Sequence, residues 1–250
     1  MAIIPGVVLA FSIASIGQLQ PEVRVVTVSC VANDEALSVI LPTDPKITKK
    51  FREVASLIRD GNWKRIVALL QEVLDSPKEI YIQVTREGPA GVKRTKWTSA
   101  FTEANHLLGK MPAEVRKNYE RSYGPIATRE LDDAVKARDW EHVARVGRRY
   151  VHTSAGARAL ADLGTHHMEK GHTLEAAAAY LSLVDRGRLD ELSSRVLYDA
   201  SFALHKANDQ QQVERIWPLL RAKVRQCGLR VNDRDLSVQE LSSILSVRRD

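Results

Sequence analysis

The sequence contains few cysteines, glycines, prolines and aromatic residues, and each shortage excludes a class of protein. Its 250 residues include two cysteines, Cys30 and Cys227, which are too few for a disulfide framework or a four-cysteine zinc site. Because neither lies in a CxxC motif, we expect two free thiols, with a pair in an exported protein as the alternative. Thirteen glycines and nine prolines exclude a collagen-like or low-complexity chain. Aromatic residues make up 6%, whereas alanine, leucine, arginine and glutamate are plentiful, which favours helices over a β-sandwich.

The charge balance is basic but evenly spread. Lysine and arginine number 37 against 31 aspartates and glutamates, which gives a net charge of +6. A basic balance raises nucleic acid or an anionic surface as a ligand. Charges of both signs are interleaved along most of the chain and no polybasic tail occurs, so a nucleic-acid partner is not favoured.

Residues 1–42 form a separate segment that is apolar and rich in β-branched residues. The apolar run over residues 3–16 is short for a membrane-spanning helix, and no positive charge precedes it. It is therefore either a buried strand or hydrophobic arm, or a degenerate export signal, and the second reading slightly favours the periplasm or cell envelope over the cytoplasm. Residues 22–29 and 36–41 predict short β-strands.

Residues 43–250 predict a series of helices that begins with a helix hairpin. Thr43 or Asp44 is suited to cap the first helix, with Pro45 in its first turn. The expected buried stripe of this helix consists of Phe51, Val54, Ala55 and Ile58. A turn at residues 60–63 leads to a second helix, whose buried face should hold Ile66, Val67, Leu69, Leu70, Val73 and Leu74.

One β-hairpin interrupts the helices. Between residues 78 and 98, Ile80, Ile82 and Val84 alternate with other side chains, and a glycine-rich turn at 87–91 allows the chain to return antiparallel. Pro218 predicts a kink or break in the penultimate helix. The further helices are expected at about 98–108, 113–121, 125–137, 140–150, 155–170, 174–185, 191–206, 210–226 and 237–247.

The turns between helices recur at a spacing near 34 residues. Asp139, Gly171 and Asn208 are separated by 32 and then 37 residues, and Trp63 and Trp140 follow their turns at the same position. A period near 34 is typical of tetratricopeptide (TPR) helical solenoids. We therefore predict a mostly α fold, namely a right-handed α-solenoid of TPR-like hairpins over residues 43–250, with the small inserted β-hairpin.

Residues 157–186 form the repeat that best matches the tetratricopeptide pattern. We expect Gly164 and Ala176 to let two helices approach closely, and Gly171 to relieve the backbone of the turn. Tyr180 should fill the groove to the next hairpin, and His167 stands where a tyrosine is usual. The expected packing residues are Leu163, Gly164, His167, Gly171, Ala176 and Tyr180.

Several segments together resemble a known family. Four segments follow one another in an order that resembles the N-terminal helical region of large planctomycete-type bacterial proteins. These segments are the run Tyr119-Glu120-x-x-Tyr123-Gly124, the helix at 131–137, the stretch at 148–156 and the Leu163-Gly164 hairpin. The resemblance covers about residues 46–205. In that family an eight-bladed β-propeller of the pyrroloquinoline-quinone-binding (PQQ) type usually follows, and the layout is similar to membrane-coat proteins. The resemblance implies a propeller domain as a partner and peripheral membrane association, with any quinone chemistry outside this chain.

No catalytic, nucleotide-binding or metal motif is recognisable. GxxxxGK[ST], a GxGxxG after a strand, HExxH and GxSxG are all missing. His166 and His167 with His172 raise the question of a metal site, but adjacent helical side chains point about 100° apart. Packing or surface histidines are therefore favoured, and we expect no cofactor in this chain and no enzymatic activity.

Arg148 and Arg149 allow two interpretations. They could clamp a phosphate or an acidic peptide end. The favoured alternative is positive charge near a helix C-terminus, with Tyr150 buried and Thr153 or Ser154 capping the next helix.

The predicted function is a helical-repeat scaffold for protein–protein interaction. Solenoids bind extended peptides or partner domains on a concave surface lined by the first helix of each pair. In the best repeat the candidate partner-binding residues are Arg158, Asp162, Thr165, His166 and Glu169. The alternatives are an accessory domain of a PQQ-dependent quinoprotein and a nucleic-acid-binding helical-repeat protein.

Overall fold

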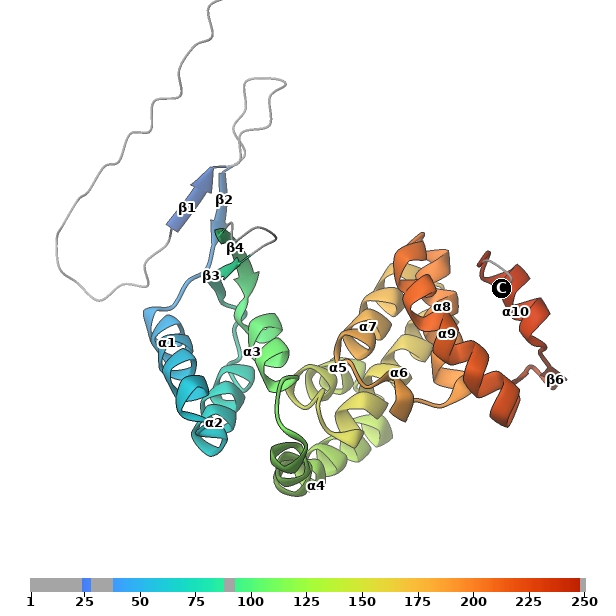
Figure 1. Cartoon of the computed structure of the whole chain (residues 1–250), viewed down its shortest axis with the longest axis horizontal. Helices are drawn as coiled ribbons and strands as arrows, with labels where there is room; N and C mark the ends of the chain where they lie inside the picture. The colour runs from blue at the N-terminus through green and yellow to red at the C-terminus, as the bar shows by residue number, and fades with distance from the viewer. Residues whose placement is uncertain (1–23, 28–37, 88–92, 248–250) are drawn as a thin grey trace, which may run out of the picture.

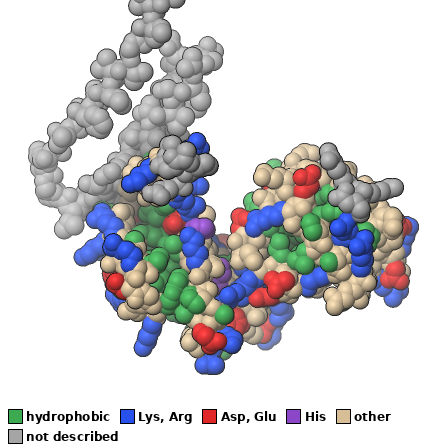
Figure 2. Space-filling view, in the orientation of Figure 1, with side chains coloured by type: hydrophobic (Ala, Val, Ile, Leu, Met, Phe, Trp, Pro, Cys, Tyr) green, Lys and Arg blue, Asp and Glu red, His purple; other side chains and the backbone are tan. Residues whose placement is uncertain are grey.

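The protein is mostly helical, with small antiparallel sheets of two strands each. The computed structural model describes residues 24–27, 38–87 and 93–247. Two groups of helices lie at the ends of an arch, with one long helix between them, and the molecular surface is hollowed between the two ends (Figures 1 and 2). Within the described residues, no helix has the length and apolar character needed to cross a membrane.

The N-terminal segment contains the two short strands that the sequence predicts. Strand β1 (Arg24–Thr27) pairs antiparallel with β2 (Ser38–Leu41). The apolar run at residues 3–16 and Cys30 lie outside the described residues, so the predictions about export and about cysteine pairing stay predictions. Cys227 is exposed and forms no disulfide within the described part of the chain.

Helices α1 (Pro45–Asp60) and α2 (Trp63–Leu74) form the expected hairpin. The Asp44 carboxylate accepts a hydrogen bond from the backbone N–H of Lys46 at 2.7 Å and caps α1. The predicted stripe of α1 is wrong at two positions, because Ala55 and Ile58 are exposed. The buried face of α1, which packs against α2, consists instead of Ile47, Phe51, Val54 and Leu57. The predicted face of α2 is buried or half-buried throughout.

The inserted hairpin consists of β3 (Tyr81–Glu87) and β4 (Lys93–Ser99) and leads directly into α3 (Ala100–Leu108). Ile80 and Ile82 are buried while Gln83 is exposed, as the alternation predicts. The Ser99 hydroxyl accepts a hydrogen bond from the N–H of Phe101 at 3.2 Å and caps α3. The hairpin therefore rests with one face on the first helices.

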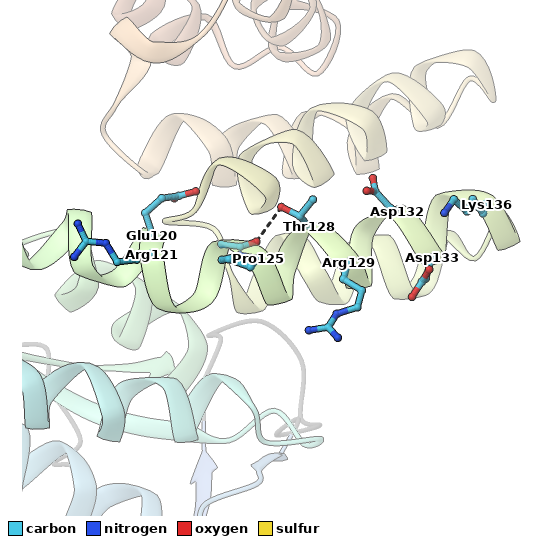
Figure 3. A pocket seen from close by; sticks show the side chains of 9 residues that line it. Glu120, Arg121, Pro125, Thr128, Arg129, Asp132, Asp133 and Lys136 are labelled. Carbon is cyan, nitrogen blue, oxygen red and sulfur yellow. Dashed lines mark hydrogen bonds between the residues drawn. The ribbon is translucent and has the colours of Figure 1, made fainter.

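Helix α4 (Ala113–Ala137) is one continuous helix, whereas the sequence predicted two, at about 113–121 and 125–137. Pro125 removes only one backbone donor, and the Thr128 hydroxyl bonds the carbonyl of Gly124 at 2.9 Å beside it (Figure 3). Tyr119 and Leu131, on either side of the proline, are both buried. Burial of this face offsets the lost hydrogen bond. The same holds for Pro218 in helix α9 (Gln210–Cys227), which is not broken there.

The remaining elements follow one another in short steps. Helix α5 packs against α6, α6 against α7, α7 against α8 and α8 against α9, while α6 also contacts α4 and α8. A 3₁₀ turn occupies residues 189–191, and Ser193 caps α8, so α8 begins three residues later than predicted. The elements are α5 (Trp140–Arg149), α6 (Ser154–Glu169), α7 (Thr173–Asp185), η2 (Leu189–Glu191), α8 (Ser194–Lys206), α9, β5 (Arg230–Val231), β6 (Arg234–Asp235) and α10 (Val238–Ile244).

Three hydrophobic clusters succeed one another along the chain. The first joins α1–α3, the β3–β4 hairpin and the start of α4. The second joins α4, α5, α6 and Ala179 of α7, and the third extends from α6 to α10. Tyr123 packs against both the first and the second cluster. Each part of the core is thus formed by elements that are neighbours in sequence.

Four helix–helix turns share one backbone geometry. Gly61, Arg138, Gly171 and Asn208 each adopt a left-handed conformation, with φ of 68°, 56°, 75° and 61°. At each turn the following residue donates its N–H to a carbonyl five positions earlier, as His172 does to His167 at 2.9 Å. This is the hydrogen bond of a Schellman cap. The turns that the sequence predicted are therefore physically equivalent.

Candidate interaction surface

Two of the five candidate residues on α6 lie together beside α4. The guanidinium of Arg158 is 3.4 Å from the Asp132 carboxylate of α4 and 3.5 Å from the Asp162 carboxylate of its own helix. Arg158 is exposed and Asp162 is half-buried. Burial raises the pKa of Asp162, and the charge of Arg158 opposes that rise.

The other three candidates lie elsewhere on α6. The Thr165 hydroxyl is 3.1 Å from the Tyr180 hydroxyl of α7. The His166 ring stacks on Trp140 of α5, with ring centroids 3.9 Å apart and planes inclined by 12°. Glu169 is exposed at the end of the helix. The structure therefore brings Arg158 and Asp162 together, while Thr165 and His166 contact neighbouring helices.

The six expected packing residues lie at the α6–α7 contact. A Cβ atom on Gly164 would lie 2.5 Å from the Tyr180 ring, so this ring packs directly on Gly164 within the α6–α7 hairpin. Tyr180 also belongs to the hydrophobic cluster that includes α8. Leu163, Ala176 and Tyr180 are buried and Gly171 lies in the turn. The His167 ring lies 6.0 Å from that of His172, and its Nδ1 atom is buried without a hydrogen-bond partner within the described residues.

Helix α4 carries an open groove of about 720 Å³. In Figure 3, Glu120, Thr128 and Asp132 project to one side of the helix, and Arg129 and Asp133 to the other. The groove is lined by Glu120, Arg121, Gly124, Pro125, Thr128, Arg129, Asp132, Asp133 and Lys136. The sequence analysis missed this groove because it expected two helices, at about 113–121 and 125–137, in place of one.

Helix α8 repeats the charge pair of α6. The Arg195 Nε atom is 2.8 Å from the Asp199 carboxylate, and both residues lie 37 positions after Arg158 and Asp162. Burial raises the pKa of Asp199, while Arg195 lowers it. The interval equals that between the turns at Gly171 and Asn208. Helices α6 and α8 therefore carry an Arg–Asp pair at equivalent positions.

The arginine pair at the end of α5 is engaged within the chain. Arg148 lies over the Phe101 ring, 4.5 Å from its centroid. Arg149 forms ion pairs with Asp75 at 2.9 Å and with Glu130 at 3.2 Å, so it connects the α1–α3 body to α4. Tyr150 is buried beside it. The Thr153 hydroxyl accepts a hydrogen bond from the N–H of Gly156 and caps α6. These contacts agree with the favoured interpretation.

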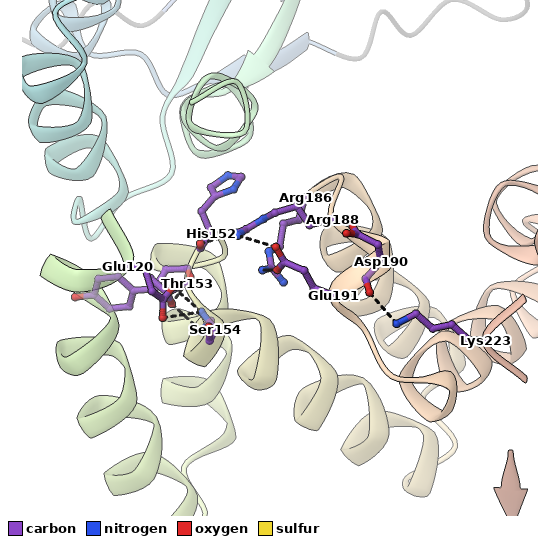
Figure 4. Close-up of polar contacts among 11 residues, drawn as sticks. Glu120, His152, Thr153, Ser154, Arg186, Arg188, Asp190, Glu191 and Lys223 are labelled. Carbon is purple, nitrogen blue, oxygen red and sulfur yellow. Dashed lines mark hydrogen bonds and ion pairs between the residues drawn. The ribbon is translucent and has the colours of Figure 1, made fainter. Parts of the chain in front are cut away.

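A polar cluster at the start of α6 was not predicted (Figure 4). Arg188 donates to the carbonyl of His152 at 2.6 Å, and Arg186, whose side chain is buried, pairs with Glu191 at 2.5 Å. The His152 Nε2 atom lies 2.8 Å from the carbonyl of Asn105 and must donate to it. The pKa of His152 is lowered to about 4, mainly by burial and in addition by the nearby arginines, while the hydrogen bond to Asn105 opposes this shift. The imidazole is neutral at pH 7 and joins α3, α6 and the α7–α8 connection.

The sequence offered no signal for this cluster, because its contacts join residues that are far apart and several of them are to backbone carbonyls. Within the described part of the chain, no three His, Cys, Asp or Glu side chains are grouped to hold a metal ion. Neither a protein-family model nor a curated protein nor a solved structure matches this chain.

Proposed function

We propose that this chain is a non-enzymatic scaffold that binds a partner protein along the face of α4, α6 and α8. In this proposal residues 43–250 are a right-handed solenoid of TPR-like hairpins. Support comes from the four equivalent turns, from the packing of each helix on its successor, and from the contacts of α6 with both α4 and α8. Solenoids of this kind use the surface formed by alternate helices to bind extended segments.

The observation that carries the proposal is the open groove of about 720 Å³ on α4, together with an Arg–Asp pair that recurs on α6, which contacts α4, and on α8, which contacts α6. Charges of both signs border this face, and their ion pairs are exposed enough to exchange partners. The matching ligand is an extended segment with both acidic and basic side chains. The resemblance to planctomycete-type proteins makes a β-propeller domain a candidate for the bound partner.

A matched pair of double variants tests the proposal. Arg158→Ala with Asp132→Ala removes an ion pair of the α4–α6 face, and Arg215→Ala with Asp185→Ala removes an equally exposed pair between α7 and α9. Exposed pairs contribute about 0–1 kcal/mol, so both variants should keep their melting temperature. A partner purified with the full-length protein from its native cell should be lost from the first variant only. Equal retention by both variants would contradict the proposal.

A further inference from the structure

The β3–β4 hairpin has a strand edge with no partner among the described residues. Within the described residues, the sheet consists of β3 and β4 alone. On the edge of β3 that faces away from β4, the N–H of Tyr81 donates a hydrogen bond to the carbonyl of Pro42 at 2.8 Å. No described segment outside the hairpin forms a backbone hydrogen bond with residues 93–99 of β4. The unpaired N–H and C=O groups of such an edge form a template for an added strand.

The register shows which backbone groups of β4 point outward. The N–H of Ala100 donates a hydrogen bond to the carbonyl of Ile80, so these two residues form a hydrogen-bonded pair of the antiparallel ladder. Such pairs alternate with non-hydrogen-bonded pairs, so the next hydrogen-bonded pairs are Ile82–Thr98, Val84–Lys96 and Arg86–Arg94. The intervening residues of β4 direct their N–H and C=O groups away from β3. These residues are Lys93, Thr95 and Trp97.

The side chains at this edge are basic and have no acidic partner among the described side chains. Lys93, Arg94 and Lys96 are exposed, and none of them forms an ion pair with a described carboxylate. Arg94 lies directly opposite Arg86, a like-charge cross-strand pair that is unfavourable without an anion nearby. The buried carboxylate of Glu103 pairs with Arg86 and leaves Arg94 uncompensated. In Figure 2, Lys and Arg side chains gather at the end of the body where the hairpin lies.

We propose that the outer edge of β4 binds an extended acidic segment of a partner protein, which adds to the hairpin as a third strand. Main-chain hydrogen bonds to Lys93, Thr95 and Trp97 would supply affinity, and alternate side chains would supply specificity. Acidic side chains of the segment lie beside Arg94 and Lys96 on one face. β-branched or aromatic side chains lie beside Thr95 and Trp97 on the other.

An acidic peptide is favoured over single-stranded nucleic acid at this edge. Sites for single strands combine a basic groove with exposed aromatic stacking surfaces. Here Phe101 is buried under Arg148, and Trp97 and Tyr81 are half-buried. An unpaired strand edge is instead the feature that a peptide backbone recognises.

Thr95→Pro separates strand addition from plain charge attraction. The N–H of Thr95 faces outward, so proline there removes an edge donor and leaves the β3–β4 ladder intact. Thr95→Val is the matched control, because it keeps the N–H and loses only the hydroxyl that bonds Thr85. The probe is a fluorescent nine-residue peptide of alternating glutamate and valine, and fluorescence anisotropy with the full chain measures its binding.

The wild type and Thr95→Val should bind this peptide with a Kd below about 100 µM. Thr95→Pro and Arg94→Glu/Lys96→Glu should bind at least tenfold more weakly at an unchanged melting temperature, and a lysine–valine peptide should not bind. Arg158→Ala/Asp132→Ala should bind normally, which keeps this result separate from the α4–α6–α8 proposal. No binding by the wild type, equal binding by Thr95→Pro, or tighter binding of a single-stranded oligonucleotide than of the peptide would overturn the inference.

Discussion

The ring of Tyr180 occupies the space that a side chain on Gly164 would need. A Cβ atom at residue 164 would lie 2.5 Å from Cε2 of that ring, and the ring hydroxyl is 3.1 Å from the hydroxyl of Thr165. Helices α6 and α7 can therefore approach closely only because residue 164 is glycine. This contact anchors the hairpin that carries Arg158 and Asp162.

Gly164→Ala should destabilise the protein. Alanine is the better helix former by about 1 kcal/mol, but the clash with Tyr180 should cost about 1–3 kcal/mol through overpacking. Urea unfolding monitored by circular dichroism measures the net effect. The double variant Gly164→Ala/Tyr180→Ala should cost less than the sum of the single variants, since the added methyl then has room. A stabilising Gly164→Ala would contradict the contact.

The turn at Gly171 should tolerate asparagine better than alanine. Its φ of 75° is unfavourable for residues with a Cβ, and no atom lies within 4 Å of the position a Cβ would take, so backbone strain alone is tested. Gly171→Ala should lose about 1–2 kcal/mol, and Gly171→Asn less, as Asn208 occupies the equivalent turn at φ 61°. Thermal unfolding of both variants gives the comparison. Equal losses would argue against equivalence of the two turns.

The helices and turns are largely predictable because their signals are local. Apolar spacing locates α2 and α5–α9, and Gly61, Gly171 and Asn208 supply the left-handed residues of three turns. The prediction fails where tertiary packing decides. Pro125 is compatible with a continuous α4 because the buried faces on both sides hold the helix together, and sequence alone does not weigh that burial. Similarly, only the position of α2 shows that Ala55 and Ile58 of α1 face solvent.

The candidate site is predictable in part. Helix phase indicates the exposed side of α6 and hence Arg158 and Asp162. It does not indicate Asp132, which lies 26 positions before Arg158 in the chain. The place of Asp132 beside Arg158 depends on α4 being one continuous helix. Nor does it indicate the cluster of Arg188 and His152, because one of these contributes a backbone carbonyl. Every residue has a backbone carbonyl, so the sequence does not show which carbonyl accepts such a hydrogen bond.

His152 should make stability depend on pH in the acid range. Its pKa in the folded protein, about 4, is below its ordinary value of about 6.5, so the unfolded chain binds the proton more tightly. The contribution of neutral His152 to the free energy of unfolding is complete above about pH 6.5 and is lost as the pH falls towards 4. Its full size is about 3 kcal/mol.

Urea unfolding of the wild type and of His152→Gln from pH 7.5 to 4.5 measures this dependence. Comparing the two proteins removes the opposite contributions of Asp162 and Asp199, whose raised pKa values favour folding as the pH falls. The difference between wild type and variant should shrink with falling pH. A difference that is constant over this range would contradict a buried neutral His152.

Tyr119 and Gln71 form a buried hydrogen bond between α4 and α2. The Tyr119 hydroxyl donates to the Gln71 side-chain oxygen at 2.8 Å, and both residues are buried. Tyr119→Phe leaves that oxygen without its donor and should cost about 1–3 kcal/mol in urea unfolding. Tyr123→Phe is the matched control, because Tyr123 is half-buried on the same helix, and its loss should be well below 1 kcal/mol. Equal losses would place Gln71 in contact with water.

Site-specific photo-crosslinking in the native cell tests most directly whether a partner protein binds along α4, α6 and α8. A benzophenone side chain at Arg129 would lie in the groove, and the same group at Arg225, exposed on α9, serves as the control. Binding along this face predicts a cross-linked partner from residue 129 that is missing from residue 225 and is lost in the Arg158→Ala/Asp132→Ala background. A partner captured from residue 225 but not from residue 129 would contradict it.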